Sequence, residues 1–218
     1  MAELLARSPV TPASPVVADG WEVSGLRSSA SLTLADLTPL AKVAVRARPA
    51  GAMASALGVP FGRAARDAAG ALLIGSGPGE WLALGPAGQE AALRGRLEQT
   101  AASAAAGELV TVLDLTHGRA LLRLTGAQAA ATLAKVCGID LADSRVPPGA
   151  AFRSSVAKLV ADVVRDDLTS SDATGGEGQA RSYLLHCERS YGQYLFDALL
   201  DAGAEFGIAV DGFRAPGI

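Results

Sequence analysis

Cysteine, histidine and aromatic residues are scarce in this sequence of 218 residues. The two cysteines, Cys137 and Cys187, allow at most one disulfide, and neither belongs to a Cys-x-x-Cys pair. The two histidines, His117 and His186, form no His-x-x-x-His or Glu-x-x-His pair. We therefore expect two reduced, mostly buried thiols and no metal site made by this chain alone.

The sequence also lacks an excess of positive charge and a long apolar run. The formal net charge is −3, the isoelectric point is about 5.4, and Lys and Arg are scattered, so we expect no nucleic-acid partner. No stretch approaches the roughly 18 consecutive apolar residues of a membrane span. The first seven residues carry Glu3 and lack an apolar core, which is a poor match to a signal peptide. These patterns predict a cytoplasmic protein without a membrane partner.

An internal repetition organises what is present. Asp36-Leu37-Thr38 and Asp114-Leu115-Thr116 each precede an apolar stretch with a basic residue. Farther along, Trp81 corresponds to Tyr183 in the same register. We expect an extended arm over residues 1–20, a first copy over 21–108 and a second copy over 109–218, with both copies packed as one compact unit.

Periodicity predicts the elements of both copies. In the first copy we expect strands at 41–47, 71–74 and 81–84 and helices at 51–58 and 89–105. In the second we expect strands at 120–124, 153–159, 160–164 and 183–187, helices at 127–136 and 191–200, and a mobile surface loop at 169–179. Strands covered by helices predict an α+β fold: two similar α/β-sandwich-like halves with mostly antiparallel sheets. The prolines of residues 8–20 predict an arm that forms no internal hydrogen bonds and lies on a larger partner.

Few residues suggest chemistry. Gly75-x-Gly77-x-Gly79 is followed by a strand rather than a helix, so we interpret it as a hairpin turn and not as a nucleotide loop. His186 and Cys187 are neighbours on a predicted strand, so their side chains point to opposite faces and cannot act as a pair. We therefore expect no catalytic, cofactor-binding or metal-binding residue in this chain.

Two polar segments remain as candidates. Asp114, Thr116 and His117 could share a proton with a substrate, but a turn closed by side-chain to backbone hydrogen bonds is the favoured interpretation. Arg189, Tyr191 and Tyr194 lie between the last strand and the last helix. Arg and Tyr are enriched at interface hot spots, which makes these three residues a candidate partner contact beside the alternative of helix capping and core packing.

The motifs taken together resemble the gamma subunit family of heterotetrameric sarcosine oxidase, a relative of the folate-binding aminomethyltransferases. The resemblance spans about residues 7–210 and rests on residues 7–9, 79–86, 114–126, 147–149 and 189–195. It implies a small accessory subunit beside alpha, beta and delta subunits, which would carry FAD, covalent FMN, NAD and tetrahydrofolate. It further implies that the complex demethylates sarcosine oxidatively to glycine, transfers the one-carbon unit to tetrahydrofolate and produces hydrogen peroxide.

Two alternatives stay open. A free-standing folate-binding aminomethyltransferase-like protein would place Asp114 near the folate amine, although such enzymes are far longer and have a third domain. A soluble adaptor of another complex is the third interpretation.

Overall fold

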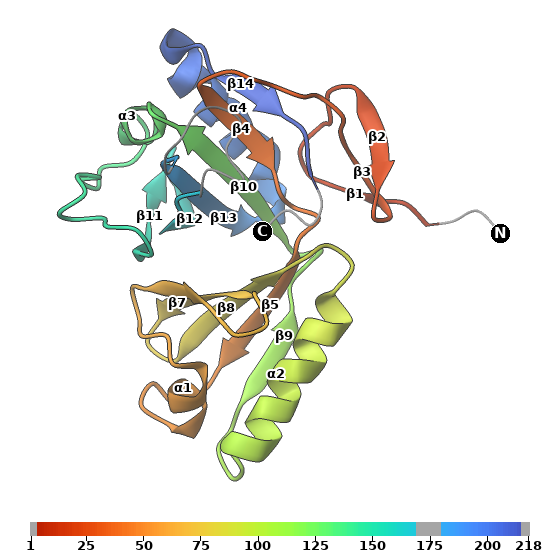
Figure 1. Ribbon diagram of the computed structural model, residues 1–218, viewed down its shortest axis with the longest axis vertical. Helices are drawn as coiled ribbons and strands as arrows, with labels where there is room; N and C mark the ends of the chain where they lie inside the picture. Colours follow the sequence, from red (N-terminus) through yellow and green to blue (C-terminus); the bar gives the residue numbers. More distant parts are fainter. Residues whose placement is uncertain (1–3, 169–179, 215–218) are drawn as a thin grey trace.

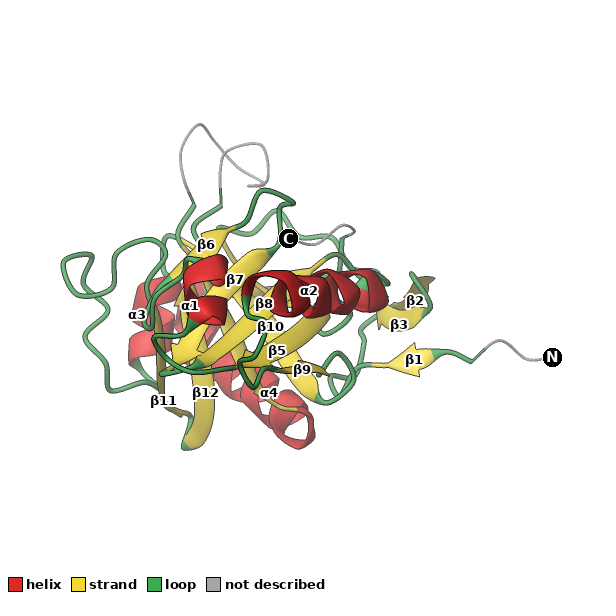
Figure 2. Cartoon of the chain, turned by 90° about the horizontal axis from the view of Figure 1, so that it is seen from below, coloured by secondary structure: helices red, strands yellow, loops and turns green. Residues whose placement is uncertain are grey.

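Two large β-sheets face each other in the computed structural model, and helices cover their outer faces (Figures 1 and 2). The structure describes residues 4–168 and 180–214. The predicted loop at 169–179 lies outside the described residues. No helix in the described ranges has the length and apolar character needed to cross a membrane.

The first large sheet has six strands, all antiparallel to their neighbours except the parallel pair β14/β4. Their order is β11 (Ala151–Val156), β12 (Leu159–Arg165), β13 (Ser182–Glu188), β10 (Arg119–Gly126), β4 (Leu32–Asp36) and β14 (Ala209–Asp211). The helices of this half are α3 (Ala129–Ala134) and α4 (Gly192–Gly203), with short 3-10 turns η1 (Arg189–Tyr191) and η2 (Ala204–Phe206) at the ends of α4. Leu195 and Leu199 of α4 pack on Tyr183 and Leu185 of β13 in one core.

The second large sheet has five strands, all antiparallel. Their order is β6 (Ala64–Arg66), β7 (Leu72–Gly77), β8 (Glu80–Gly85), β5 (Ala41–Arg46) and β9 (Thr111–Asp114). The helices α1 (Ala52–Leu57) and α2 (Glu90–Ala104) cover one face, where Met53 and Leu93 pack on Trp81.

The uncovered faces of the two sheets meet in a third core. Because side chains alternate along a strand, Leu184 points to this core while its neighbours Tyr183 and Leu185 point to the helices. Leu82 and Leu84 of β8 face Leu184 from the other sheet. The order helix, sheet, sheet, helix confirms the predicted α+β class with mostly antiparallel, helix-covered sheets.

The two sheets exchange strands. The strand β4 belongs to the predicted first copy but pairs with β10, and β9 belongs to the predicted second copy but pairs with β5. The chain therefore crosses between the sheets twice, from β4 to β5 and from β9 to β10 (Figure 1). Trp81 and Tyr183 both face the helix-covered sides of their sheets, which agrees with the predicted correspondence. The duplication and its boundaries stay a prediction.

The N-terminal arm differs from the prediction. Its residues form β1 (Ala6–Arg7) and β2 (Pro15–Ala18), which flank β3 (Trp21–Ser24) in a three-stranded sheet. The arm is hydrogen-bonded to β3 of the predicted first copy, and its prolines occupy loops and the edge strand β2, where a missing amide donor is tolerated. Its contact with a larger partner stays a prediction. Val10 is buried in the core beneath α4, so the arm packs on its own chain.

Local boundaries differ from the prediction in one instructive place. The strand expected at 153–159 ends at Val156, and a two-residue turn of Ala157 and Lys158 joins β11 to β12. Both turn residues have positive φ, 49° and 68°. Glycine or asparagine usually occupies such positions, so the sequence carried no turn signal here. The predicted hairpin at Gly75–Gly79 is confirmed by the pairing of β7 with β8.

Candidate functional site at the crossing of the two sheets

The two Asp-Leu-Thr segments form matching turns where the chain crosses between the sheets. The Asp36 carboxylate accepts a hydrogen bond from the Thr38 amide at 3.0 Å, and the Asp114 carboxylate accepts one from the Thr116 amide at 2.8 Å. Each carboxylate thus closes its own bend, which frees the following residues to enter the other sheet.

Each turn is also hydrogen-bonded to the strand that follows the other turn. The Thr38 hydroxyl oxygen accepts a hydrogen bond from the Leu121 amide at 3.3 Å, and the Thr116 hydroxyl oxygen accepts one from the Lys42 amide at 3.1 Å. In return, the Leu121 carbonyl accepts from Leu37 and the Lys42 carbonyl accepts from Leu115, both at 2.8 Å. The arrangement is reciprocal, because each crossing supplies a hydrogen-bond donor and an acceptor to the other.

A lysine is buried at the centre of the crossing. The Lys42 ammonium group donates to the carbonyl oxygens of Thr38 at 2.6 Å and Leu40 at 2.8 Å, and its residue has no exposed surface. Burial lowers the pKa of Lys42 to about 7, although the nearby carboxylates of Asp36 and Asp114 act in the opposite direction. Burial likewise raises the pKa of Asp36. No pattern in the sequence indicated this lysine, because one basic residue in an apolar strand is no signal for burial.

His117 stacks on Trp21 rather than pairing with Asp114. The two ring centroids are 4.8 Å apart and the rings are nearly parallel, at 8°. No hydrogen bond joins the His117 and Asp114 side chains in the described part of the chain. His117 thus packs against β3, the central strand of the small sheet. Asp114 and Thr116 supply the turn, and a role of these residues toward a substrate stays a prediction.

Arg189 lies at the same crossing, beneath the N-terminal arm. Its guanidinium donates to the Arg7 carbonyl, and its positive charge contributes to the lowered pKa of Lys42. The next helix approaches the arm so closely that a Cβ at Gly192 would lie 2.5 Å from Pro9. The structure therefore brings Asp114, Thr116, His117 and Arg189 to one region.

The two tyrosines predicted beside Arg189 differ from it in their surroundings. Tyr191 is 48% exposed and Tyr194 is 52% exposed. The Tyr194 hydroxyl donates to the Ala157 carbonyl at 3.2 Å, and its ring lines a cavity of about 450 Å³ between α3, α4 and the β11–β12 turn. The interface role of Arg189, Tyr191 and Tyr194 stays a prediction.

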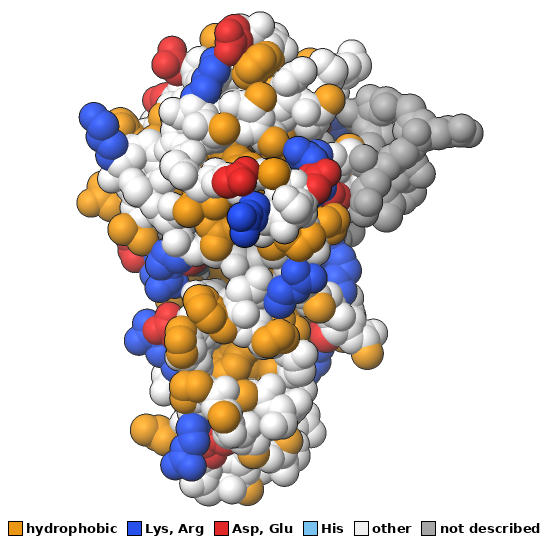
Figure 3. Space-filling view, turned by 90° about the vertical axis from the view of Figure 1, so that its left-hand side faces the viewer, with side chains coloured by type: hydrophobic (Ala, Val, Ile, Leu, Met, Phe, Trp, Pro, Cys, Tyr) orange, Lys and Arg blue, Asp and Glu red, His pale blue; other side chains and the backbone are white. Residues whose placement is uncertain are grey.

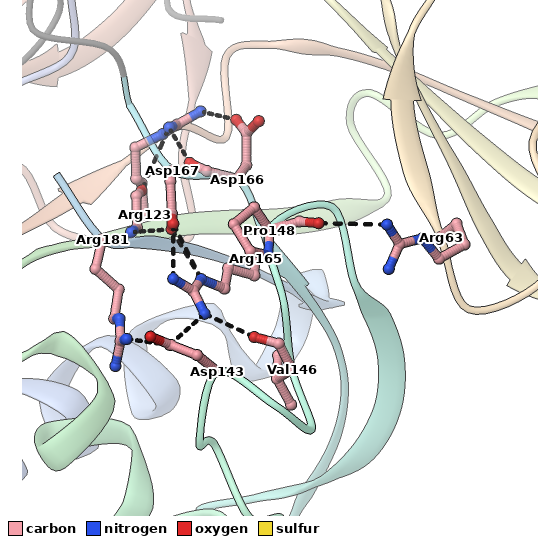
Figure 4. Close-up of polar contacts among 10 residues, drawn as sticks. Arg63, Arg123, Asp143, Val146, Pro148, Arg165, Asp166, Asp167 and Arg181 are labelled. Atoms are coloured by element: carbon pink, nitrogen blue, oxygen red, sulfur yellow. Dashed lines mark hydrogen bonds and ion pairs between the residues drawn. The ribbon is translucent and has the colours of Figure 1, made fainter. Parts of the chain in front are cut away.

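A second polar cluster, which sequence analysis missed, surrounds Arg165 (Figure 4). Its buried guanidinium donates to Asp143 at 2.6 Å, to Asp167 at 2.8 Å and to the Val146 carbonyl at 2.7 Å. Asp166 pairs with Arg123 of β10 at 3.0 Å and with Arg66 of β6 at 3.2 Å. The cluster therefore ties the six-stranded sheet to the five-stranded one. Arg66, Arg123 and Asp143 are far in sequence from the consecutive residues Arg165 to Asp167, which is why no motif indicated the cluster.

The pKa values of the remaining candidate groups, His186 and Cys187, disfavour their charged forms. Cys187 and His186 point to opposite faces of β13, as predicted: Cys187 packs in the core beneath α4, while the His186 ring lies 3.4 Å from the Asp162 carboxylate between the sheets. Burial raises the pKa of the Cys187 thiol to about 11, which disfavours the reactive thiolate. Burial lowers the pKa of His186. No cluster of metal-ligating side chains occurs among residues 4–168 and 180–214.

The architecture is an aminomethyltransferase-like fold. The structure of the glycine cleavage system aminomethyltransferase T from Bartonella henselae superposes with a TM-score of 0.69 at 20% identity, covering 95% of this chain and 60% of that one. The heterotetrameric sarcosine oxidase from Corynebacterium sp. U-96, in complex with pyrrole 2-carboxylate, contains a chain with a TM-score of 0.64 at 26% identity. That match covers 84% of this chain and 89% of that one.

Sequence comparison specifies the family. The sarcosine oxidase subunit gamma of Arthrobacter sp. is 32% identical over 145 residues, which are 63% of this chain and 66% of that relative. The profile of the sarcosine oxidase, gamma subunit family matches residues 43–205. The chain belongs to this family, as the resemblance in the sequence implied.

Proposed function

We propose that this chain is a non-catalytic subunit of a heterotetrameric sarcosine oxidase. Its partners are alpha, beta and delta subunits, which carry FAD, FMN, NAD and tetrahydrofolate. The complex demethylates sarcosine oxidatively to glycine, transfers the one-carbon unit to tetrahydrofolate and releases hydrogen peroxide, in the cytoplasm. Membership of the gamma subunit family is the observation that carries this proposal.

The chemistry of the crossing supports an accessory role. The Lys42 ammonium group, whose pKa is about 7, is buried and donates hydrogen bonds to two backbone carbonyls. A group that catalyses proton transfer must reach its substrate, and Lys42 has no exposed surface through which to do so. Asp114, Thr116 and His117 are engaged in the turn and in the stack on Trp21.

The free-standing folate-binding alternative is not favoured. The family profile that matches residues 43–205 is that of the sarcosine oxidase gamma subunit, whereas the likeness to the aminomethyltransferase T structure, at 20% identity, concerns the fold alone.

Purification of the tagged full-length chain from its host tests the proposal. We expect three further subunits by mass spectrometry, and sarcosine-dependent production of hydrogen peroxide by the assembled complex. The chain purified alone should show no visible flavin absorbance. A stoichiometric flavin spectrum from the isolated chain, or partners unrelated to flavoenzymes, would contradict the accessory-subunit proposal.

A further inference from the structure

A loop between α1 and β6 presents an aromatic ring to solvent. Phe61 is 61% exposed, although phenylalanine contributes most to stability when it is buried. Its neighbour Pro60 and Pro148 of the other half are exposed as well. The ring thus lies beside the seam where the five-stranded and six-stranded sheets meet.

The backbone of this loop is fixed to both sheets. Gly62 donates to the Gly75 carbonyl of β7 at 3.0 Å, and its own carbonyl accepts from the Ala151 amide of β11 at 2.9 Å. The approach to β7 is so close that a Cβ at Gly75 would lie 2.2 Å from the Pro60 carbonyl oxygen. Phe61 is therefore held in place by its backbone, and a partner that binds it would lose little conformational entropy in the loop.

Phe61 lies in a segment without acidic residues. Residues 41–66 contain five basic residues. Of these, Lys42 is buried, and Arg46 and Arg66 pair with Glu80 and Asp166. Figure 3 shows the face with β7 and β11, where hydrophobic side chains gather between the lobes, with Lys and Arg and some Asp and Glu side chains around them. Glu80 pairs with Arg46 at 3.2 Å and lies 3.7 Å from Arg153, so this carboxylate is already occupied.

Arg63 has no carboxylate partner among residues 4–168 and 180–214. Its guanidinium reaches across the seam to the Pro148 carbonyl at 3.4 Å (Figure 4) and forms no ion pair with the described residues. An exposed arginine two residues from a fixed, exposed phenylalanine has the composition of an interface hot spot.

We propose that Phe61 and Arg63 form a docking surface for an acidic protein surface, with an apolar pocket for the ring and a carboxylate for the guanidinium. The inference rests on the proposed function, because the partner is then another subunit of the same oxidase complex. A second copy of this chain does not fit, since a symmetric contact would place the Arg63 guanidinium groups of both copies in one interface.

Four variants of the full-length chain, each co-expressed with the other subunits, test this surface. The measurement is the amount of flavoprotein retained on the tagged chain at low and high salt. Phe61→Ser and Arg63→Glu alter the proposed contact. Val160→Ser and Lys158→Glu serve as matched controls at the β11–β12 hairpin, where Val160 is 71% exposed. They likewise replace an exposed apolar residue by Ser and a basic residue by Glu.

We expect Phe61→Ser and Arg63→Glu each to reduce retention about tenfold, and the controls to change it less than about twofold. The loss in Arg63→Glu should depend on salt, whereas that in Phe61→Ser should not. Thermal melting of each free chain verifies folding, and Arg63→Glu still tests the surface if Phe61→Ser unfolds. Unchanged retention, or equal losses in the controls, would overturn the docking surface alone. A wild-type chain that retains no flavoprotein would overturn the proposed function and this surface with it.

Discussion

Raising the pH from about 7 to about 9 should stabilise this protein through Lys42. Burial lowers the pKa of Lys42 from 10.5 to about 7 in the folded state, while the unfolded chain keeps the ordinary value. Between these two values the unfolded state binds more protons than the folded state, so the free energy of unfolding increases with pH. The penalty for burying the charge is fully present below about pH 7 and disappears as the pH approaches 10.5.

The size of the effect follows from the two pKa values. One pKa unit corresponds to about 1.4 kcal/mol. From about pH 7 to about pH 9, Lys42 in the folded state passes from half to almost fully deprotonated, while it stays mostly charged in the unfolded state. The expected gain in the free energy of unfolding is roughly 2 kcal/mol over this interval.

Denaturant unfolding of the wild type and Lys42→Met at both pH values measures the effect, because groups common to both proteins cancel in the difference. Burial raises the pKa of Asp36, and its titration would lower stability as the pH rises through that value. The double variant Lys42→Met/Asp36→Asn removes this contribution and should lack the gain. If the wild type and both variants change in parallel, the burial of a titrating lysine at the crossing is refuted.

Two further predictions concern packing. Deletion of residues 1–20 should lower the free energy of unfolding by about 2–4 kcal/mol, because it removes the buried Val10 and the contacts of the arm; an unchanged melting temperature would contradict this packing. Gly75→Ala should cost about 1–3 kcal/mol in denaturant unfolding, because its Cβ would collide with the Pro60 carbonyl. Gly95→Ala in the middle of α2, where the Cβ meets no atom within 4 Å, should instead stabilise by about 0.5–1 kcal/mol, and the same sign in both variants would refute the close approach.

Local sequence patterns were sufficient for much of the secondary structure. Periodicity predicted a helix at 191–200, and Leu195, Phe196 and Leu199 of this helix lie in the core beneath α4. The glycines at 75–79 predicted a hairpin because turn chemistry is encoded within a few residues. Where the local signal was atypical, as at Ala157 and Lys158, the prediction placed the strand end incorrectly.

The arrangement of the site depended on tertiary structure. The sequence by itself indicated a turn at Asp114-Leu115-Thr116, repeated in pattern at Asp36-Leu37-Thr38, and its resemblance to a known family was correct. It did not determine that each turn is hydrogen-bonded to the strand after the other turn, that Lys42 is buried at the crossing, or that the proline-rich arm covers Arg189. The hydrogen bonds between turn and strand join residues 74 and 83 positions apart, and the contact of the arm with Arg189 spans 182 positions. Such contacts arise from strand pairing and sheet packing, which no periodicity within a short window specifies.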